Sequence, residues 1–372
     1  MRVPAAAVAL IVFGALAATA AEAPLVIVGG TLVDGTGRAP LADPAIVIQD
    51  GRIARVTTSA GESMPADARR IEARGKWIIP GLIDMHVHYY EWMNEAFLQH
   101  GVTTVRDVGN NLERILELRR QSRSSDAKGP RVFTCGPLID GPLPRHGTGI
   151  SVSVSTENEA REIARQLIAR GVDCLKVYEQ LTPGLVRAIA DEAQRAGMPV
   201  TAHLRDTPAA AALEAGVTGL EHALGFEACD ERAGADVARL LAARGAYVVP
   251  TLVVLDPLAP RLACLKRFLG RLTRPERRVV AGSDTANLRP RPGVLLHREL
   301  ELLVEAGLSS QDAVMAATST AAGLLGQRAT LGTIEPGKTA DLVILRGDPL
   351  GSIAEIRSVD VVIRDGRVVW RK

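Results

Sequence analysis

An apolar stretch, residues 79–88, ends in two histidines, His86 and His88. The stretch is typical of a β-strand, in which residues i and i+2 point to the same face. Both imidazoles would then point at one spot, and neutral imidazole is the commonest metal ligand among protein side chains. The pair by itself also fits a strand that ends in two surface histidines, so its spacing makes metal binding a hypothesis.

Four further ionisable residues lie in or directly after other apolar segments: Lys176, His203, His222 and Asp284. Each has an ordinary explanation by itself. A lysine in an apolar strand often extends its amine to the surface, and an aspartate after a strand often caps the next helix. If the fold brings all six residues together, four imidazoles and a carboxylate meet, and these are typical ligands of catalytic metals.

The elements that would gather these residues are alternating strands and helices between residues 81 and 334. The predicted strands are Ile83–Val87, Thr103–Asp107, Arg131–Cys135, Cys174–Val177, Val200–Ala202, Gly219–Glu221, Tyr247–Val249 and Val279–Gly282. Alternation indicates a parallel sheet, and eight strand–helix units in about 250 residues have the size of a (β/α)8 TIM barrel. The carboxyl ends of barrel strands carry the chemistry, which would place the six residues on one rim. An open doubly wound sheet is the alternative, although no Gly-rich dinucleotide or phosphate-loop fingerprint follows any strand.

The two ends of the chain have β patterns. Asp50-Gly51 and Asp365-Gly366 each separate two apolar runs, and Asp-Gly between such runs is a strong hairpin signal. We therefore predict a small β-sandwich domain from residues 24–80 and 335–372, with the barrel at 81–334.

With these segments in place, the chain resembles the metal-dependent amidohydrolase superfamily, in the binuclear branch that has a carboxylated lysine. Within it, the chain resembles imidazolonepropionase-like and Xaa-Pro-dipeptidase-like members. The resemblance runs from about Val26 to the C-terminus and includes Pro80–His88, Leu175–Tyr178, Glu221-His222, Gly282–Asp284 and Gly332–Val343.

The resemblance implies two divalent metal ions, expected to be Zn²⁺. His86, His88 and Asp284 would bind the more buried ion, and His203 and His222 the more exposed one. Lys176, carboxylated by CO2, would bridge them, because a carbamate supplies two oxygens and a negative charge where an ammonium cannot bind a cation. A hydroxide between the ions would attack the substrate, with Asp284 as the catalytic acid and base.

The expected function is hydrolysis of a C–N (amide) bond, in a dipeptide or an N-acyl amino acid. A lactonase or phosphotriesterase can use the same pair of metals and is the alternative. A deaminase is disfavoured by Lys176, because deaminating relatives generally use one metal and lack the lysine. A non-catalytic periplasmic binding protein has no need of an acid–base aspartate beside a bridging carbamate.

Several residues on the predicted rim are candidates for substrate binding: Tyr89, Arg145, His146, Tyr178, Arg289 and Arg291. Arginine binds carboxylates through two parallel hydrogen bonds, and tyrosine adds hydroxyl donors. These residues predict a substrate with a free carboxylate near the scissile amide, although any single arginine is equally explained as solvated surface charge.

Residues 1–20 are typical of an export signal. Arg2 precedes an apolar run, and Ala18-Thr19-Ala20 is a small-residue cleavage site. We expect cleavage after Ala20 and a periplasmic or secreted protein. An uncleaved membrane anchor is the alternative, but the run is short and rich in alanine.

The charge balance limits the partners. The 372 residues include 44 Lys and Arg against 42 Asp and Glu, a formal net charge of +2. This balance and an aromatic content of 3% give no support for a nucleic-acid or anionic-membrane partner. We expect a small-molecule substrate and no stable membrane insertion of the mature chain, and the sequence is compatible with a homo-oligomer.

The chain has four cysteines, which an exported protein can pair. Cys135 ends a predicted strand and Cys174 begins the next, so we expect them at opposite ends of the barrel. Cys229 and Cys264 follow neighbouring strands on the same rim, and we predict a disulfide between them that tethers two loops; two buried free thiols are the alternative.

Overall fold

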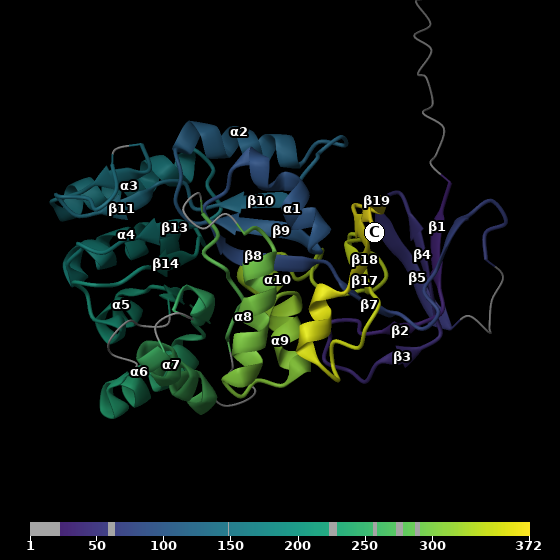
Figure 1. Cartoon of the computed structure of the whole chain (residues 1–372). Coiled ribbons are helices and arrows are strands. Elements are labelled where there is room, and N and C mark those ends of the chain that lie inside the picture. The colour runs from purple at the N-terminus through teal and green to yellow at the C-terminus, as the bar shows by residue number, and fades with distance from the viewer. Residues whose placement is uncertain are drawn as a thin grey trace, which may run out of the picture.

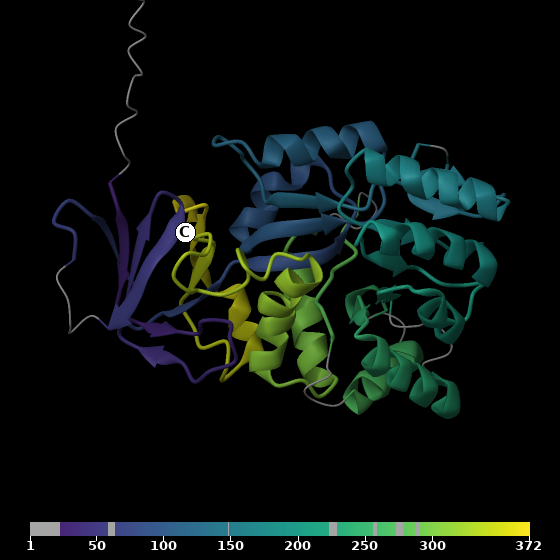
Figure 2. The same cartoon turned by 180° about the vertical axis from the view of Figure 1, so that it is seen from behind.

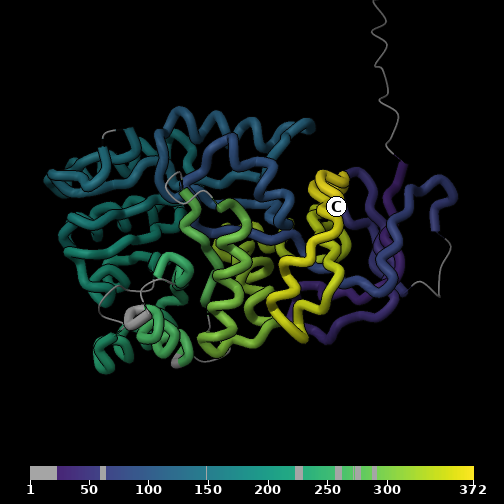
Figure 3. Tube along the Cα trace, viewed as in Figure 1, coloured from purple at the N-terminus to yellow at the C-terminus, as the bar shows by residue number. Residues whose placement is uncertain are grey.

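The computed structural model of the chain describes residues 23–58, 64–147, 149–222, 229–255, 259–272, 278–286 and 291–372. It has two parts, an α/β barrel and a layer of two β-sheets that combines strands from near both ends of the chain (Figure 1). From behind, the purple and yellow strands lie together on one side and the blue-to-green α/β part on the other (Figure 2). The Cα trace leaves the purple strands, runs through the barrel and returns as the yellow strands (Figure 3).

The β layer consists of one sheet in the order β5-β4-β1-β6 and another in the order β19-β18-β17-β7-β2-β3. The strands are β1 Leu25–Val28, β2 Thr31–Leu32, β3 Leu41–Ala42, β4 Pro44–Gln49, β5 Arg52–Thr58, β6 Arg69–Glu72, β7 Trp77–Pro80, β17 Leu342–Leu345, β18 Val359–Arg364 and β19 Arg367–Arg371. Apolar side chains of both sheets, among them Ile27, Ile78 and Ile344, form one buried core. This arrangement is consistent with the predicted β-sandwich.

Two of its hairpins turn at the predicted Asp-Gly pairs. The φ angles are 50° at Asp50 and 75° at Gly51, and 48° at Asp365 and 76° at Gly366. Positive φ at both central positions matches the right-handed twist of the strands, and this conformation is what makes Asp-Gly the favoured sequence there.

The barrel has short parallel strands with helices outside them. Its strands are β8 Leu82–Val87, β9 Val102–Asp107, β10 Arg131–Thr134, β11 Leu138–Asp140, β12 Ser151–Ser153, β13 Leu175–Val177, β14 Val200–Ala202, β15 Gly219–Glu221 and β16 Tyr247–Val249. Its α-helices are α1 Asn94–Gln99, α2 Leu112–Ser122, α3 Glu157–Ala169, α4 Pro183–Arg195, α5 Ala209–Ala215, α6 Glu231–Arg244, α7 Ala259–Arg271, α8 Val294–Glu305, α9 Ser310–Ala316 and α10 Ser319–Leu324. The 3-10 helices are η1 Glu91–Met93, η4 Leu252–Val254 and η5 Ile353–Arg357.

Helix α3 shows how the sequence sets these boundaries. Thr156 precedes it, and the Thr156 hydroxyl accepts from Glu159 N while the Glu159 carboxylate accepts from Thr156 N. This capping box satisfies backbone donors that a helix start leaves unpaired. Ala160, Ala164 and Leu167 recur at helical spacing on its buried face.

The strands pair in parallel from β8 through β10 and from β11 through β13 to β16. The two groups meet where β10 ends, because Asp173 N donates to Thr134 O over 2.7 Å. On the other side, Val280 N donates to Val248 O and Met85 N to Ala281 O. These bonds join the last segment to both neighbours, as a barrel requires.

The predicted eighth strand, Val279–Gly282, is not a regular strand. Val279 forms an isolated bridge with Val248, and Thr285, beyond the predicted range, forms another with Val87. Asp284 has a φ of 52°, so the extended run cannot continue past it. Gly282 permits the close approach to β8, because a Cβ there would lie 2.8 Å from His86 Cβ.

The predicted Cys229–Cys264 disulfide is present, with a Cα–Cα distance of 5.3 Å. The expectation that Cys135 and Cys174 lie at opposite ends of the barrel is wrong, because they form a second disulfide. The stagger of the barrel explains the difference. The hydrogen bond from Asp173 to Thr134 places the start of β13 beside the end of β10.

In the described ranges, no helix is long and apolar enough to cross a bilayer. The predicted signal segment, residues 1–20, lies outside them.

Replacing either cysteine pair by alanines should lower the free energy of unfolding by about 3–4 kcal/mol, because a cross-link restricts the unfolded chain. The two losses should be similar, since the paired cysteines are 39 and 35 residues apart in the sequence. Urea unfolding of both paired variants measures this. Recovery of all four cysteines as thiols in non-reducing peptide mapping would contradict the assignment.

Candidate metal centre

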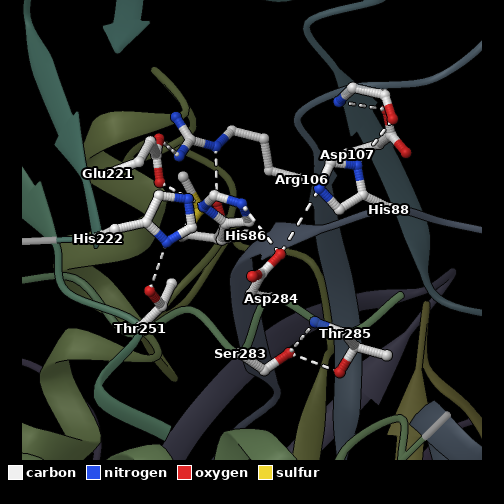
Figure 4. Close-up of polar contacts among 12 residues, drawn as sticks. His86, His88, Arg106, Asp107, Glu221, His222, Thr251, Ser283, Asp284 and Thr285 are labelled. Atoms are coloured by element: carbon white, nitrogen blue, oxygen red, sulfur yellow. Dashed lines mark hydrogen bonds and ion pairs between the residues drawn. The ribbon is translucent and has the colours of Figure 1, made fainter. Parts of the chain in front are cut away.

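Three of the predicted ligands converge at the carboxyl end of β8. One ligand atom each from His86, His88 and Asp284 lies within 4.8 Å of the others. Asp284 Oδ1 is 3.4 Å from His86 Nε2 and 3.5 Å from His88 Nε2 (Figure 4). The backbone holds this position, because Asp284 N donates to His86 O over 2.8 Å. Two imidazoles and a carboxylate facing one point can hold a divalent metal.

The other two predicted histidines lie beside this group. The ring centroid of His222 is 4.6 Å from that of His86 and 4.4 Å from that of His203. The His203 ring is also 4.5 Å from the ring of Tyr178. The structure therefore brings together the four histidines that the sequence placed on three strands.

Protein acceptors hold the Nδ1 atoms of two rings. His86 Nδ1 is 2.6 Å from Glu221 Oε2, and His88 Nδ1 is 2.8 Å from Gly109 O. A carboxylate and a carbonyl can only accept, so both rings donate through Nδ1 and keep the Nε2 lone pair for a metal. His222 Nδ1 lies 2.8 Å from the Thr251 hydroxyl, and His203 Nε2 lies 3.3 Å from Glu179 Oε1.

Burial favours the neutral form of His86, His203 and His222, and metal binding requires neutral imidazoles. It lowers the pKa of His203 to about 3 and holds the pKa of His222 well below its usual range. The pKa of His86 is lowered chiefly by burial, with Glu221 acting in the opposite direction.

Lys176 lies in β13, and its side chain is 1% exposed. Its Nζ is buried and has no hydrogen-bond partner within the described part of the chain. The pKa of Lys176 is lowered to about 8, chiefly by burial, with Glu221 and Asp284 opposing the shift and Arg106 contributing to it. A buried amine without a partner is costly unless another group satisfies it. The charge of Lys176 acts on the imidazoles of His86, His203 and His222, so this amine lies in the same buried cluster.

Glu221 is a residue of this centre to which the sequence analysis gave no role. It accepts from His86, Arg106 and Thr201 and is fully buried. The signal was available, because a glutamate in an apolar strand and Arg106 inside another are unusual unless paired. The sequence alone does not show that Glu221, Arg106 and His86, on three different strands, are partners.

Asp84 is a second such residue. It accepts from Ser283 N over 2.9 Å and from the Ser283 hydroxyl over 2.5 Å, and burial raises its pKa to about 7. These bonds attach the segment that carries Asp284 to β8.

Some of the predicted substrate residues gather near His203. The Tyr178 hydroxyl lies 3.0 Å from His146 Nε2, and Arg145 Nη1 lies 3.4 Å from Glu179 Oε2. Tyr89 does not join them, because it is buried and its hydroxyl donates to Asn94. Arg291 is exposed, and Arg289 lies outside the described residues.

Comparisons with known proteins identify the family of the chain. The Amidohydrolase family profile matches residues 77–369. Adenine deaminase 2 of Rhizobium meliloti is 29% identical over 93% of this chain and 56% of its own length. Adenine deaminase of Paracoccus denitrificans is 35% identical over 28% of this chain and 18% of its own length. The chain thus spans at most about half the length of these two relatives.

Among solved structures, a putative prolidase from Bifidobacterium longum superposes with a TM-score of 0.80 at 29% identity, covering 94% of this chain and 95% of that one. A Xaa-Pro dipeptidase with bound methionine gives 0.80 at 24%, covering 94% and 100%. The chain therefore belongs to the Amidohydrolase family, and its α/β barrel and β-sheet layer match solved structures of that family.

Glu299 on α8 gives a prediction about pH. Its Oε2 accepts from Val253 N over 2.8 Å, next to the Thr251 that contacts His222, and within the described residues its buried Oε1 has no partner. Burial raises the pKa of Glu299 from 4.5 to about 8. The folded chain therefore keeps a proton that the unfolded chain releases, so stability falls as pH rises between these values.

Glu299→Gln keeps the acceptor and removes the titration. In metal-free protein, the free energy of unfolding should fall less steeply with pH in this variant than in the wild type between pH 4.5 and about 8. Urea unfolding across this range measures the slope. Parallel slopes would contradict the prediction.

Proposed function

We propose that the chain is a binuclear metal-dependent amidohydrolase that hydrolyses an amide bond in a dipeptide or an N-acyl amino acid. His86, His88 and Asp284 would hold one divalent metal, His203 and His222 a second, and a carbamate on Lys176 would bridge them. Zn²⁺ is the metal we expect. The barrel of residues 81–334 would carry the chemistry, and residues 24–80 and 335–372 would form a structural domain.

The observation that carries this proposal is the buried, unpartnered amine of Lys176 beside the histidines, as far as the described residues extend. An amine that gives up its proton can attack CO2 and form a carbamate, with release of a proton. The carbamate would bring two oxygens that share one negative charge into the group of imidazoles. A mononuclear site of His86, His88 and Asp284 would leave the amine unexplained.

The metals, when bound, polarise the scissile carbonyl and lower the pKa of a bound water. The residues of the chain do the rest. Asp284 is positioned to take a proton from the attacking water and to deliver it to the leaving amine. It is partly exposed, at 20% of its side chain, so a substrate can reach it while His86 remains buried behind it.

Substrate choice is proposed from the residues near His203. Tyr178, His146 and Arg145 offer a hydroxyl, an imidazole and a guanidinium on one side of the centre. Together they suit a carboxylate next to the scissile amide. The prolidase-like neighbours support this choice, since dipeptides ending in proline have such a carboxylate.

A deaminase is the second candidate, because adenine deaminase 2 aligns with 93% of this chain. Lys176 argues against it, because a single-metal site would have no use for a bridging lysine. A lactonase or phosphotriesterase would use the same residues. A non-catalytic binding protein is a further alternative, although it would have no use for Asp284 at the metal pair.

Export is proposed from residues 1–20 together with the two disulfides, which persist in oxidising compartments. A periplasmic or secreted protein would fit both.

Lys176→Ala should abolish hydrolysis and release one or both metals, because the bridging group is lost. Lys176→Arg should be equally inactive, since a guanidinium keeps its charge and forms no carbamate. Metal analysis of purified variants by mass spectrometry is the direct measurement. Two bound metals and full activity in Lys176→Ala would overturn the binuclear assignment.

A substrate panel tests the chemistry. Dipeptides and N-acyl amino acids with a free carboxylate should be cleaved faster than the same compounds as C-terminal amides, because only the acids offer a carboxylate to Arg145. We expect a ratio of kcat/KM values of at least about tenfold, which corresponds to about 1.4 kcal/mol. Lactones, phosphotriesters and adenine serve as competing substrates. Equal rates for acids and amides would exclude the carboxylate contact, and ammonia release from adenine alone would favour the deaminase.

A further inference from the structure

Behind His86 lies a buried ion pair between Glu221 and Arg106. Glu221 Oε1 is 2.6 Å from Arg106 Nη2, and the two side chains are 0% and 2% exposed. Glu221 Oε2 is 2.6 Å from His86 Nδ1, and Arg106 Nε donates to Met85 O over 2.8 Å (Figure 4). The pair thus connects β15, β9 and β8 through charged hydrogen bonds.

We infer that Glu221 and Arg106 are positioning residues that set the orientation and basicity of His86 as a metal ligand. The inference rests on the proposed metal centre. A carboxylate that accepts from Nδ1 fixes the tautomer and turns Nε2 towards Asp284. It also makes Nε2 a stronger electron-pair donor to a metal. Arg106 has a separate task, because it compensates the charge of Glu221 in a fully buried position.

The role of Arg106 follows from what Glu221 would otherwise do. An uncompensated buried carboxylate would take up a proton or rotate towards a nearby cation. Either change would remove the acceptor from His86, and the second would add an oxygen ligand to the metal site. Arg106 holds Oε1 while His86 holds Oε2, so both carboxylate oxygens are engaged.

His88 provides an internal comparison. Its Nδ1 donates to the neutral carbonyl of Gly109 over 2.8 Å, and its side chain is 25% exposed. His86 in β8 and His88 just after it therefore differ in the charge of their acceptors. A contribution from the Glu221 charge should be specific to His86.

A buried ion pair can also serve the fold alone, so the test needs a matched pair elsewhere. Arg131 and Asp341 provide it. Their Nη1–Oδ2 distance is 2.7 Å, with side chains 14% and 7% exposed, and they join β10 to the β layer. Removing both charges of either pair avoids leaving one buried charge uncompensated.

The experiment compares Arg106→Met/Glu221→Gln with Arg131→Met/Asp341→Asn in the full chain loaded with Co²⁺. The amide that replaces the Glu221 carboxylate is not anionic but can still accept from His86, so circular dichroism should stay native in both variants. The half-time of Co²⁺ loss to a chelator should fall about 10–100-fold in the first variant, and its visible absorption band should change. The second variant should match the wild type.

Glu221→Asp provides an independent arm if the double variant does not fold. It keeps the charge for Arg106 but shortens the side chain, so contact with His86 is lost and Co²⁺ loss should again accelerate at least about tenfold. Wild-type half-times and spectra in these variants would overturn the positioning role and leave the metal centre intact. A wild-type chain that takes up no Co²⁺ or Zn²⁺ would overturn the proposed function itself.

Discussion

The proposed metal centre depends on one physical constraint, a buried amine that must be satisfied. Lys176 places an amine in the mouth of a barrel, at 1% exposure, and no side chain or backbone group of the described residues satisfies it. Leaving a polar group in this condition costs free energy. A lysine that only stabilised the fold would be paired or would reach solvent. This unsatisfied amine is the reason for proposing that Lys176 carries a further group.

The rest of the site consists of successive layers of side-chain contacts. Imidazole nitrogens of His86 and His88 face Asp284, and their opposite nitrogens are held by Glu221 and Gly109. Arg106 holds Glu221 in turn. The backbone is strained where these layers meet, because His222, Thr251 and Asp284 all have positive φ. Non-glycine residues take this conformation at a cost, which is more readily explained by function than by folding.

Much of the fold could be predicted from the sequence because its signals are local. The Asp-Gly hairpins depend on two residues each, and α3 begins where a threonine and a glutamate form a capping box. The four histidines and Lys176 followed from one rule, that strand ends of a parallel barrel share a rim. Asp284 followed from the same rule, although its segment forms isolated bridges and not a strand.

What could not be predicted depends on contacts between distant strands. The bond between Cys135 and Cys174 follows from the stagger of β10 and β13, which no local pattern encodes. Glu221 and Arg106 each look anomalous in an apolar strand, yet only the fold shows that they are partners. Tyr89 follows His88 directly, but its hydroxyl donates to Asn94. Neighbouring side chains of an extended chain point to opposite faces, so Tyr89 points away from the face that His88 occupies.

The binuclear proposal requires that Lys176 carries a carbamate between two metals. Nuclear magnetic resonance of wild-type protein equilibrated with ¹³C-labelled CO2, together with metal analysis of the same sample, can detect both features at once. We expect one carbamate carbon signal, absent from Lys176→Ala, and two metals per chain. An unmodified lysine in a chain that holds a single metal and still hydrolyses amides would be incompatible with the proposal.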